Sequence, residues 1–293
     1  MRFCQSMMYA EPDQWVELAR HAEAVGFDQL ALSDHVFYPE NLASEYPYTP
    51  TGKPVFKADA AWPDVWVMVG AMASVTSRIE FTTNVYVLPL RNPFVVAKAV
   101  GTAAFLTGDR VSLGIGAGWM REEFDCLEQP FGRRGARMEE QVEVLRALWQ
   151  GGLVEHHGEF YDFDKLQMAP VPSRPVPIIV GGHSDIALRR AARLGDGWIG
   201  VQYTRAELRT YLSRLNELRA EAGTLDRPFE VNAAIVDALP TPDVIDELEE
   251  MGVDTLMTSA WLIEGKTNAS LDENKRALES FAETYIAPHR DAS

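Results

Sequence analysis

The chain has 293 residues and a formal net charge of −16, a balance that argues against nucleic acid or an anionic membrane surface as a partner. Its length fits either two small domains or one α/β barrel, and 46% of its residues are hydrophobic, which is enough for one large core. It has two cysteines, no secretion signal and no long apolar run, so we expect a soluble cytoplasmic protein whose thiols are reduced.

The first half of the chain alternates apolar strands with helical repeats. Strands are predicted at residues 3–8, 27–32, 79–87 and 111–115, and helices at 12–25, 62–75, 94–106 and 134–150. Two long loops interrupt the alternation, one over residues 36–61 and one after residue 116. The first holds Tyr38 and several other aromatic residues, which favours a lid over a linker because structureless loops of this length are usually functional.

The second half resumes the alternation after a break. Residues 151–176 hold a predicted hairpin at 154–161, which turns around Gly158. Beyond it, strands are predicted at 178–180, from 198, at 229–235 and at 255–260, and helices at 184–194, 205–221, 242–251 and 272–285. Eight strands, each followed by a helix and with no internal linker, predict one TIM (β/α)8 barrel domain over residues 1–293. Its insertions follow strands 2 and 4 and precede strand 5, and an open doubly wound sheet is the alternative.

The unit at residues 177–200 carries the strongest local signal. Its short buried strand ends at Gly181-Gly182, and Ser184 or Asp185 is expected to cap the helix that follows. In that helix we expect Ile186 and Leu188 to face the core and Arg189, Arg190 and Arg193 to face solvent. The backbone N–H groups of Gly181, Gly182, His183 and Ser184 stand at a helix N-terminus, where the helix dipole favours an anion such as phosphate. A plain strand-to-helix turn is the alternative.

In a barrel of this kind the carboxyl ends of the strands meet at one mouth. Four segments would then face a single cleft: 33–35, 84–86, 116–119 and 181–184. His35 can exchange protons near neutral pH or bind a polar ligand edge, and Asp34 stands beside it. The alternative is that Asp34 holds the loop and His35 only packs.

The segment at residues 114–118 lacks the third glycine of a dinucleotide fingerprint. Gly116, Ala117 and Gly118 fit better as room for a flat ligand close to the backbone. Trp119, Phe131 and the tyrosines of the long loop, Tyr38 among them, are expected to wall an apolar substrate pocket. Arg133, Arg134 and Arg137 fit either an anion clamp or a solvated helix start, and the second is favoured.

No metal site is predicted. The pair His156-His157 lies in a polar segment, and neither an HExxH nor a CxxC spacing occurs.

Five stretches together give the chain its family resemblance: AVGFDQLALSDHVFYP, TSRIEFTTNVYVLPLRNPFVVAK, GDRVSLGIGAGWMREEFD, RRGARMEEQVEVLRALW and PVPIIVGGHSDIALRRAARLGDGWI. They resemble the bacterial-luciferase-like flavin and deazaflavin oxidoreductases over nearly the whole chain, and the last is most similar to the branch that uses coenzyme F420. The resemblance implies a TIM barrel with the cofactor ring in its mouth and the cofactor phosphate on Gly181, Gly182, His183 and Ser184. It also implies a non-proline cis peptide, here Asn84-Val85, behind the ring.

Two departures from the family pattern bear on chemistry. Luciferases carry an arginine that contacts the flavin phosphate at the position of Ala117, so its absence favours F420 over FMN. Deazaflavin sugar-phosphate dehydrogenases of the family carry a glutamate proton donor at the position of Trp119, which argues against a sugar phosphate and for an apolar substrate.

The sequence and the resemblance together lead us to expect an F420-dependent oxidoreductase that moves a hydride between the deazaflavin C5 and an organic, apolar substrate. His35 and Asp34 would lie beside the reactive face, and a homodimer is expected. An FMN-dependent monooxygenase is the first alternative, which oxygen consumption with reduced FMN would reveal. A non-catalytic cofactor-binding barrel is the second.

Overall fold

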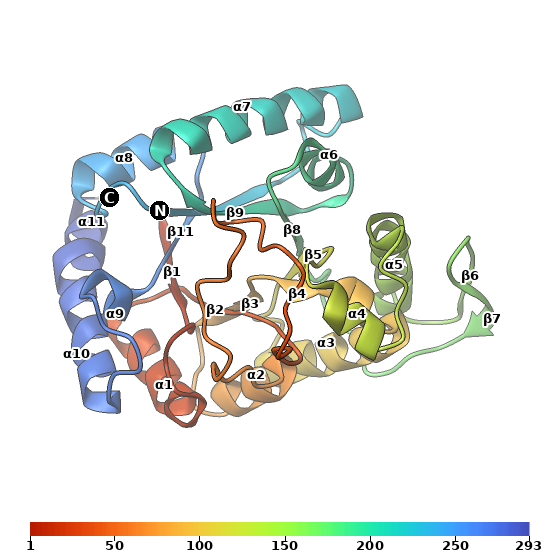
Figure 1. The fold of residues 1–293 in the computed structure, drawn as a ribbon, viewed down its shortest axis with the longest axis horizontal. Helices are drawn as coiled ribbons and strands as arrows, with labels where there is room; N and C mark the ends of the chain where they lie inside the picture. The colour runs from red at the N-terminus through yellow and green to blue at the C-terminus, as the bar shows by residue number, and fades with distance from the viewer. Residues whose placement is uncertain (293) are drawn as a thin grey trace.

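The computed structural model describes residues 1–292 and forms a closed parallel barrel surrounded by helices (Figure 1). Every pairing between neighbouring barrel strands is parallel, as helical crossovers require. The strands are β1 (Arg2–Ser6), β2 (Gln29–Leu32), β3 (Glu80–Thr83), β4 (Tyr86–Val87), β5 (Leu113–Gly116), β8 (Ile178–Gly181), β9 (Gly197–Tyr203), β10 (Glu230–Ile235) and β11 (Thr255–Thr258).

The barrel closes through one interrupted strand. β3 pairs with β2, and β4 continues the same course and pairs with β5, so the two pieces occupy one of eight strand positions. A bridge between Phe81 and Val111 joins the lower piece to the chain that leads into β5. The TIM-barrel prediction is therefore confirmed.

Eight long helices follow the eight strand positions and form the outer layer (Figure 1). They are α1 (Trp15–Val25), α2 (Val65–Ala73), α3 (Pro93–Thr107), α5 (Arg134–Trp149), α6 (Asp185–Leu194), α7 (Arg205–Ala222), α8 (Pro242–Glu250) and α10 (Leu271–Phe281). Short helical pieces fill the connections and the C-terminal end: η1 (Pro12–Gln14), η2 (Leu88–Leu90), α4 (Arg121–Cys126), α9 (Ala260–Ile263), η3 (Ala282–Ile286) and α11 (Ala287–Ala292).

Local chemistry accounts for the helix ends. Asp64 and Asn92 cap α2 and α3 through their side-chain oxygens, while Thr204 and Ser270 begin α7 and α10 with complete capping boxes. Such caps satisfy N–H groups in the first turn that have no partner inside the helix. Gly26 ends α1 in the left-handed conformation, directly after the predicted helix at residues 12–25.

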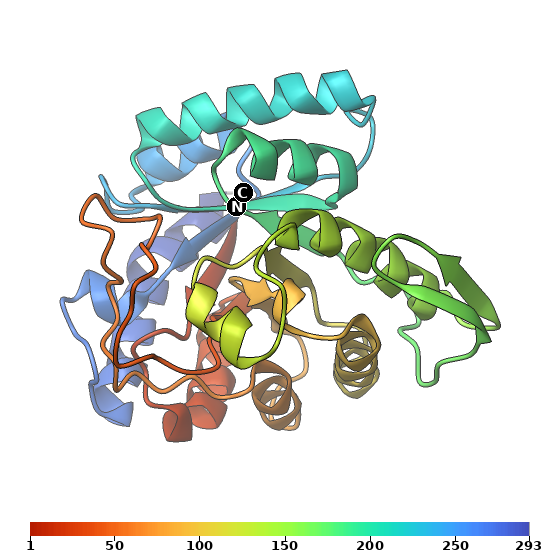
Figure 2. The same cartoon turned by 45° about the vertical axis from the view of Figure 1, so that its right-hand side comes forward.

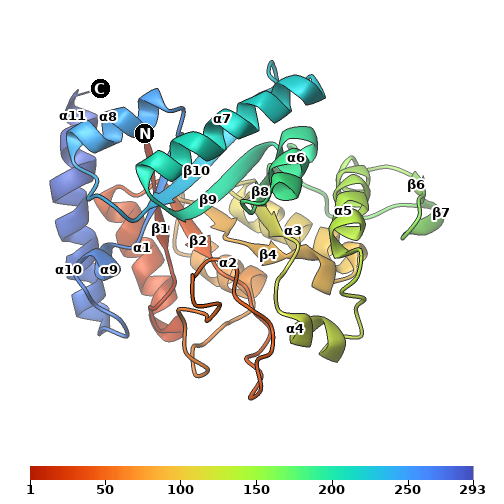
Figure 3. The same ribbon diagram turned by 45° about the horizontal axis from the view of Figure 1, so that its top comes forward.

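The insertions lie where the sequence predicts them. The hairpin β6 (Val154–His157) and β7 (Asp162–Leu166) is antiparallel and extends away from the barrel at the right of Figure 2. Residues 36–61, which we call the lid segment, contain no helix or strand and cross one side of the mouth (Figure 3).

The apolar core has two main parts, besides a small cluster of Val87, Leu90 and Phe124. The larger part lies between the strands and the helices, and the smaller fills the barrel interior with Cys4, Ala31, Ile179, Ile199 and Met257. Because successive strand residues point to opposite faces, one strand supplies both parts. Below the mouth the barrel is thus packed and not open.

Some predicted details are wrong. Ile186 is 69% exposed, whereas Arg190 is 8% exposed and bonded to Glu139 of α5. The carboxylate stabilises the buried guanidinium, so α6 turns a charged residue inward where the apolar pattern predicts Ile186. Residues 7–8 lie beyond the end of β1, and the short α4 and α9 lie where we expected a loop and the end of a strand.

Candidate functional site

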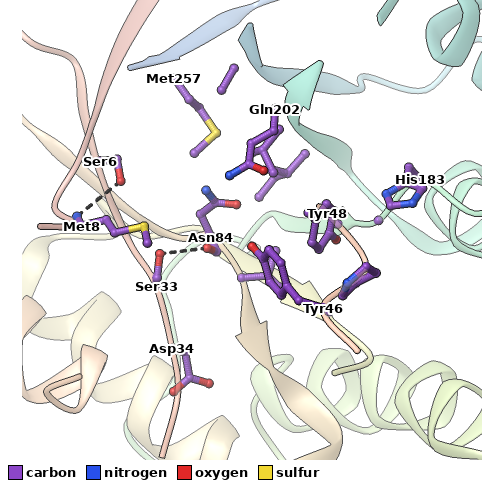
Figure 4. Close-up of a pocket in the computed structure, with 18 of the residues that line it drawn as sticks. Ser6, Met8, Ser33, Asp34, Tyr46, Tyr48, Asn84, His183, Gln202 and Met257 are labelled. Atoms are coloured by element: carbon purple, nitrogen blue, oxygen red, sulfur yellow. Dashed lines mark hydrogen bonds between the residues drawn. The ribbon is translucent and has the colours of Figure 1, made fainter. Parts of the chain in front are cut away.

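A cavity of about 620 Å³ opens at the carboxyl ends of the barrel strands. All four segments that the sequence places at the mouth contribute to its wall, and they include Asp34, His35, Asn84, Val85, Gly116, Ala117, Gly118, Trp119 and Gly181–Ser184. The volume lies within the range of small-molecule and cofactor sites. Figure 4 shows residues of the wall converging from β1, β2, the lid segment and the β8–α6 turn.

Asp34 is committed to bonds within the protein. Its Oδ1 and Oδ2 accept hydrogen bonds from the two terminal nitrogens of Arg91 at 2.8 and 2.5 Å, and Oδ2 also accepts from the N–H of Val87 at 3.0 Å. Its side chain is 4% exposed. A bidentate pair between a guanidinium and a carboxylate fixes the two side chains relative to each other. This arrangement favours a role for Asp34 in holding the loop after β4, which contains Arg91.

His35 faces a buried carboxylate that the sequence analysis did not single out. Both carboxylate oxygens of Glu123 lie 3.3 Å from Nδ1 of His35, and Oε1 accepts a hydrogen bond from the N–H of Val36 at 2.7 Å. The side chains of His35 and Glu123 are 9% and 2% exposed. A carboxylate accepts hydrogen bonds, so Nδ1 carries the hydrogen and Nε2 is the ring nitrogen that remains for a ligand.

Aromatic rings surround His35 on its other sides. The ring centroids of Phe56, Trp62 and Trp119 lie 5.0, 5.1 and 5.9 Å from that of the imidazole. All three also line the cavity. The imidazole is thereby held in one place within an apolar surrounding.

The Asn84-Val85 peptide bond is cis, as the family resemblance implies. The Asn84 carbonyl accepts a hydrogen bond from the Ser33 hydroxyl at 3.2 Å (Figure 4). A Cβ atom at Gly116 or Gly181 would lie 2.5 or 2.6 Å from a methyl group of Val85. Both positions require glycine so that Val85 can lie across the ends of β5 and β8, at the floor of the cavity.

Gly118 is constrained in the same way. Its φ is +82°, and a Cβ there would lie 2.6 Å from Val87 and 2.9 Å from Phe124. Side chains of the protein, those of Val85, Val87 and Phe124, therefore occupy the space that Gly116, Gly118 and Gly181 leave. Contact of Gly116, Ala117 and Gly118 with a flat ligand stays a prediction.

The turn between β8 and α6 fits an anion. Gly182 has φ +116°, which favours glycine, and the Ser184 hydroxyl caps α6 by accepting from the Ala187 N–H at 3.3 Å. Among the described residues, no acceptor is found for the N–H groups of residues 182–184. The turn thus presents free donors at a helix N-terminus, beside the cavity.

His183 adds an unsatisfied polar atom to this turn. Its Nδ1 is buried without a hydrogen-bond partner, and burial lowers the pKa of the imidazole. Its ring lies 5.1 Å from Tyr48 of the lid segment, and Figure 4 shows the two side chains close together. A neutral imidazole here can donate to or accept from a ligand.

The lid segment supplies the outer wall. Tyr46, Tyr48 and Phe56 line the cavity, whereas Tyr38 and Phe131 lie outside it. Tyr38 packs edge-on against Phe56 at 6.1 Å, and Phe131 packs against Phe124 at 5.2 Å. The predicted aromatic wall is therefore present in part: Trp119 and two of the long-loop tyrosines, Tyr46 and Tyr48, belong to it, whereas Tyr38 and Phe131 do not.

One carboxylate of α4 fastens the lid segment. Glu122 accepts hydrogen bonds from the N–H groups of Ala43 and Ser44 at 2.7 and 3.0 Å and from the Ser44 hydroxyl at 2.7 Å. These bonds outweigh the effect of burial and lower the pKa of Glu122. The adjacent acids Glu122 and Glu123 thus hold the lid segment and His35 from the same short helix.

Within residues 1–292 there is no group of three or more His, Cys, Asp or Glu side chains that could hold a metal ion. In the same range no helix is long and apolar enough to cross a membrane.

Comparisons with known proteins place this geometry in context. A protein of Mycobacterium tuberculosis, itself uncharacterised, is 38% identical over 289 residues, which are 98% of this chain and 99% of the relative. The F420-dependent glucose-6-phosphate dehydrogenase of Segniliparus rotundus is 33% identical over 230 residues, which are 75% of this chain and 64% of that enzyme. The fold is also that of an F420-dependent secondary alcohol dehydrogenase, with a TM-score of 0.76, 18% identity and 98% of each chain covered.

The sequence model of the luciferase-like monooxygenase family matches residues 2–277, nearly the whole chain. The chain therefore belongs to the luciferase-like monooxygenase family, whose relatives include F420-dependent dehydrogenases, and it is an oxidoreductase.

Proposed function

We propose that the protein is an F420-dependent oxidoreductase that moves a hydride between the deazaflavin C5 and an apolar organic substrate. The observation that carries the proposal is a single cavity lined both by a turn with free N–H donors and by His35, whose imidazole faces the buried Glu123. Ala117 and the F420-dependent relative at 33% identity support F420 over FMN.

The chain's own groups would hold the cofactor at two places. The N–H groups of residues 182–184 bind its phosphate, where the dipole of α6 adds to the hydrogen bonds. Val85 and the backbone of Asn84 lie at the floor of the cavity and support the ring. When bound there, the deazaflavin supplies hydride transfer at its C5 carbon.

His35 is the group that would exchange a proton with the substrate. Glu123 orients the imidazole through Nδ1, which leaves Nε2 to donate to or accept from a substrate oxygen. The buried carboxylate, 3.3 Å from Nδ1, keeps the imidazole in this orientation. Asp34 would act on the loop and not on the substrate, because Arg91 and Val87 occupy its oxygens.

The wall of the cavity suits an apolar substrate. Trp119, Tyr46 and Phe56 form a connected group of rings, with centroids 5.1 Å apart for the first pair and 6.2 Å apart for the second. Rings of this kind bury large apolar areas and exclude water from the reacting atoms. None of these three side chains carries a charge that could hold the phosphate of a sugar phosphate.

Parallel titrations with F420 and FMN test the proposed cofactor. We expect F420 to bind at least tenfold more tightly than FMN, followed by the fluorescence of each ligand, and a broad panel of alcohols and ketones to reveal turnover with F420. Tighter binding of FMN together with oxygen consumption by the reduced flavin would assign a monooxygenase instead. Tight F420 binding without turnover over the panel would favour the non-catalytic barrel.

We also propose that the protein is a homodimer that associates through the outer faces of α2 and α3. Val67, Val95, Phe105 and Leu106 on these two helices are 57–70% exposed although all are large and apolar. Exposed apolar side chains gathered on neighbouring helices mark surfaces that proteins cover.

A further inference from the structure

Three arginines gather at the rim of the cavity, beyond the β8–α6 turn. Two of them contact the ring of Phe131: the guanidinium carbon of Arg134 is 3.8 Å from the ring centroid, and that of Arg121 is 4.7 Å from it. Arg190 of α6 lines the cavity together with Gly182 and Ser184. We call Arg121, Arg134 and Arg190 the arginine cluster.

Contacts within the protein tie the cluster to the cavity. The Nε of Arg134 donates to the carbonyl of Gly118, a residue of the cavity wall, at 2.9 Å. A Cβ at Gly135, the residue after Arg134, would lie 2.5 Å from a terminal nitrogen of Arg190. The starts of α4 and α5 and the side of α6 therefore meet at this part of the rim.

The positive charge of the cluster is not balanced by its neighbours. No described carboxylate lies within 4 Å of Arg121 or Arg134, although the chain has 43 acidic residues against 27 basic ones. Arg190 does contact Glu139, through Nε and one terminal nitrogen, but Glu139 also pairs with Arg193. The nearest acids of α4, Glu122 and Glu123, are bonded to the lid segment and to the His35 loop.

Like charges held this close oppose each other. Burial lowers the pKa of Arg134, and the charges of Arg121 and Arg190 lower it further. A bound polyanion would offset this repulsion, and the planar guanidinium fork matches a carboxylate particularly well. The arginine cluster is therefore a local patch of positive charge on an otherwise acidic protein.

We propose that the arginine cluster binds the carboxylates of the glutamate tail of F420. The inference rests on the proposed function, since it follows the cofactor outward from the phosphate at residues 182–184. FMN ends at its phosphate, whereas F420 continues through a lactyl group into a chain of glutamates. The cluster begins at Arg190, which shares the cavity wall with that turn, and continues along α5 and α4.

The test compares F420 that carries several glutamates with the form that carries none. By fluorescence titration at low salt, we expect the wild-type protein to bind the long form at least tenfold more tightly, as charge-assisted hydrogen bonds to two or three carboxylates allow. Arg121→Gln and Arg134→Gln should each weaken the long form about five- to tenfold and change the affinity for the tailless form less than twofold.

Arg133→Gln is the matched control. Arg133 adjoins the cluster in sequence and carries the same charge, but it is paired with Glu159 of the hairpin insertion. We expect its affinity for both forms to stay within twofold of wild type. Because Arg134 also donates to the Gly118 carbonyl, circular dichroism and a thermal unfolding curve accompany each variant. The Arg121 guanidinium lies over the Phe131 ring and has no hydrogen-bond partner among residues 1–292, so Arg121→Gln is the deciding variant if Arg134→Gln unfolds.

Equal affinity of the wild-type protein for the two forms overturns this inference and leaves the proposed function standing. A rise in the substrate KM of the variants with unchanged F420 affinity also overturns it and assigns the cluster to the substrate. Failure of the wild-type protein to bind either form overturns the proposed function, and the inference with it.

Discussion

A single carboxylate, Glu123, determines which nitrogen of His35 is available to a ligand. In the sequence it is one of two adjacent glutamates in a segment that we expected to be a loop, and nothing in the charged run from Arg121 to Asp125 singles it out. The structure buries it at 2% exposure because the first turn of α4 points it at the loop after β2. Acidic residues that immediately follow a mouth segment are the signal that could have found it.

Substituting either member of the His35–Glu123 pair should lower activity, by different amounts and for different reasons. His35→Asn should lower kcat by about 10²–10⁴, because proton transfer by a positioned side chain contributes a factor of that size. Glu123→Gln should lower kcat by a smaller factor with little change in KM, since Gln can either donate to or accept from Nδ1 and no longer selects one tautomer.

Nitrogen-15 NMR of the histidine rings checks that explanation. The wild-type protein should show His35 protonated at Nδ1, with the signal assigned by its loss in His35→Asn, and Glu123→Gln should show both tautomers. A Glu123→Gln variant that loses activity with the wild-type tautomer would leave Glu123 with a purely structural role.

At the scale of elements, the strands and helices that the sequence predicts well are those with a repeated apolar pattern. The pattern of residues 79–87 is continuous, so it predicts one strand, but the chain forms β3 and β4 with Asn84-Val85 between them. The short α4 has too few turns for a pattern to appear. In α6 the pattern fails at Arg190, because a partner on another helix decides which residue is buried.

A carboxylate of α1 also fixes the start of β3. Glu23 accepts hydrogen bonds from the N–H groups of residues 77–79 and from the Ser77 hydroxyl. Burial alone would raise the pKa of Glu23, but these bonds outweigh it and lower the pKa from 4.5 to about 2. A depressed carboxyl pKa contributes stability above the unfolded-state value, and this contribution is lost as the pH falls toward the folded-state value.

Glu23→Gln should therefore lower the urea midpoint of unfolding at pH 7. The difference from wild type should shrink as the pH falls below about 4.5 and be lost once the pH is below about 2, measured by circular dichroism at each pH. Glu17→Gln is the matched control on the same helix, since Glu17 makes only exposed pairs with Arg20 and Lys275. A difference that stays constant with pH would mean that the charge of Glu23 is not what stabilises the turn.

At the scale of the whole molecule, the sequence predicts the barrel and its mouth because strand order alone brings residues 33–35, 84–86, 116–119 and 181–184 together. It does not predict which side chains at the mouth pair with one another. Asp34 turns to Arg91 and His35 to Glu123, both choices set by loops whose course has no periodic signal. The family resemblance supplied the cofactor class and the cis peptide, which no pattern of apolar residues contains.

The outer surface of the barrel predicts how two copies meet. α2 and α3 lie side by side at the lower edge of Figure 1, and Leu106 of α3 reaches over Gly70 of α2. Val67, Val95 and Phe105 extend this apolar surface along both helices. A second copy of the chain fits it, since a two-fold axis brings the same apolar patch of each copy together.

Phe105→Glu should therefore convert a dimer into a monomer. Light scattering coupled to size-exclusion chromatography should give twice 32.7 kDa for the wild-type protein at micromolar concentration and 32.7 kDa for the variant. The substitution would bury two like charges against each other at the two-fold axis. Their free-energy cost would exceed the net association free energy of an interface of ordinary size. Leu153→Glu is the matched control, because Leu153 is also 69% exposed but lies beside the hairpin insertion, and it should remain dimeric. A monomeric wild-type protein, or dissociation by both substitutions, would show that α2 and α3 do not form the interface.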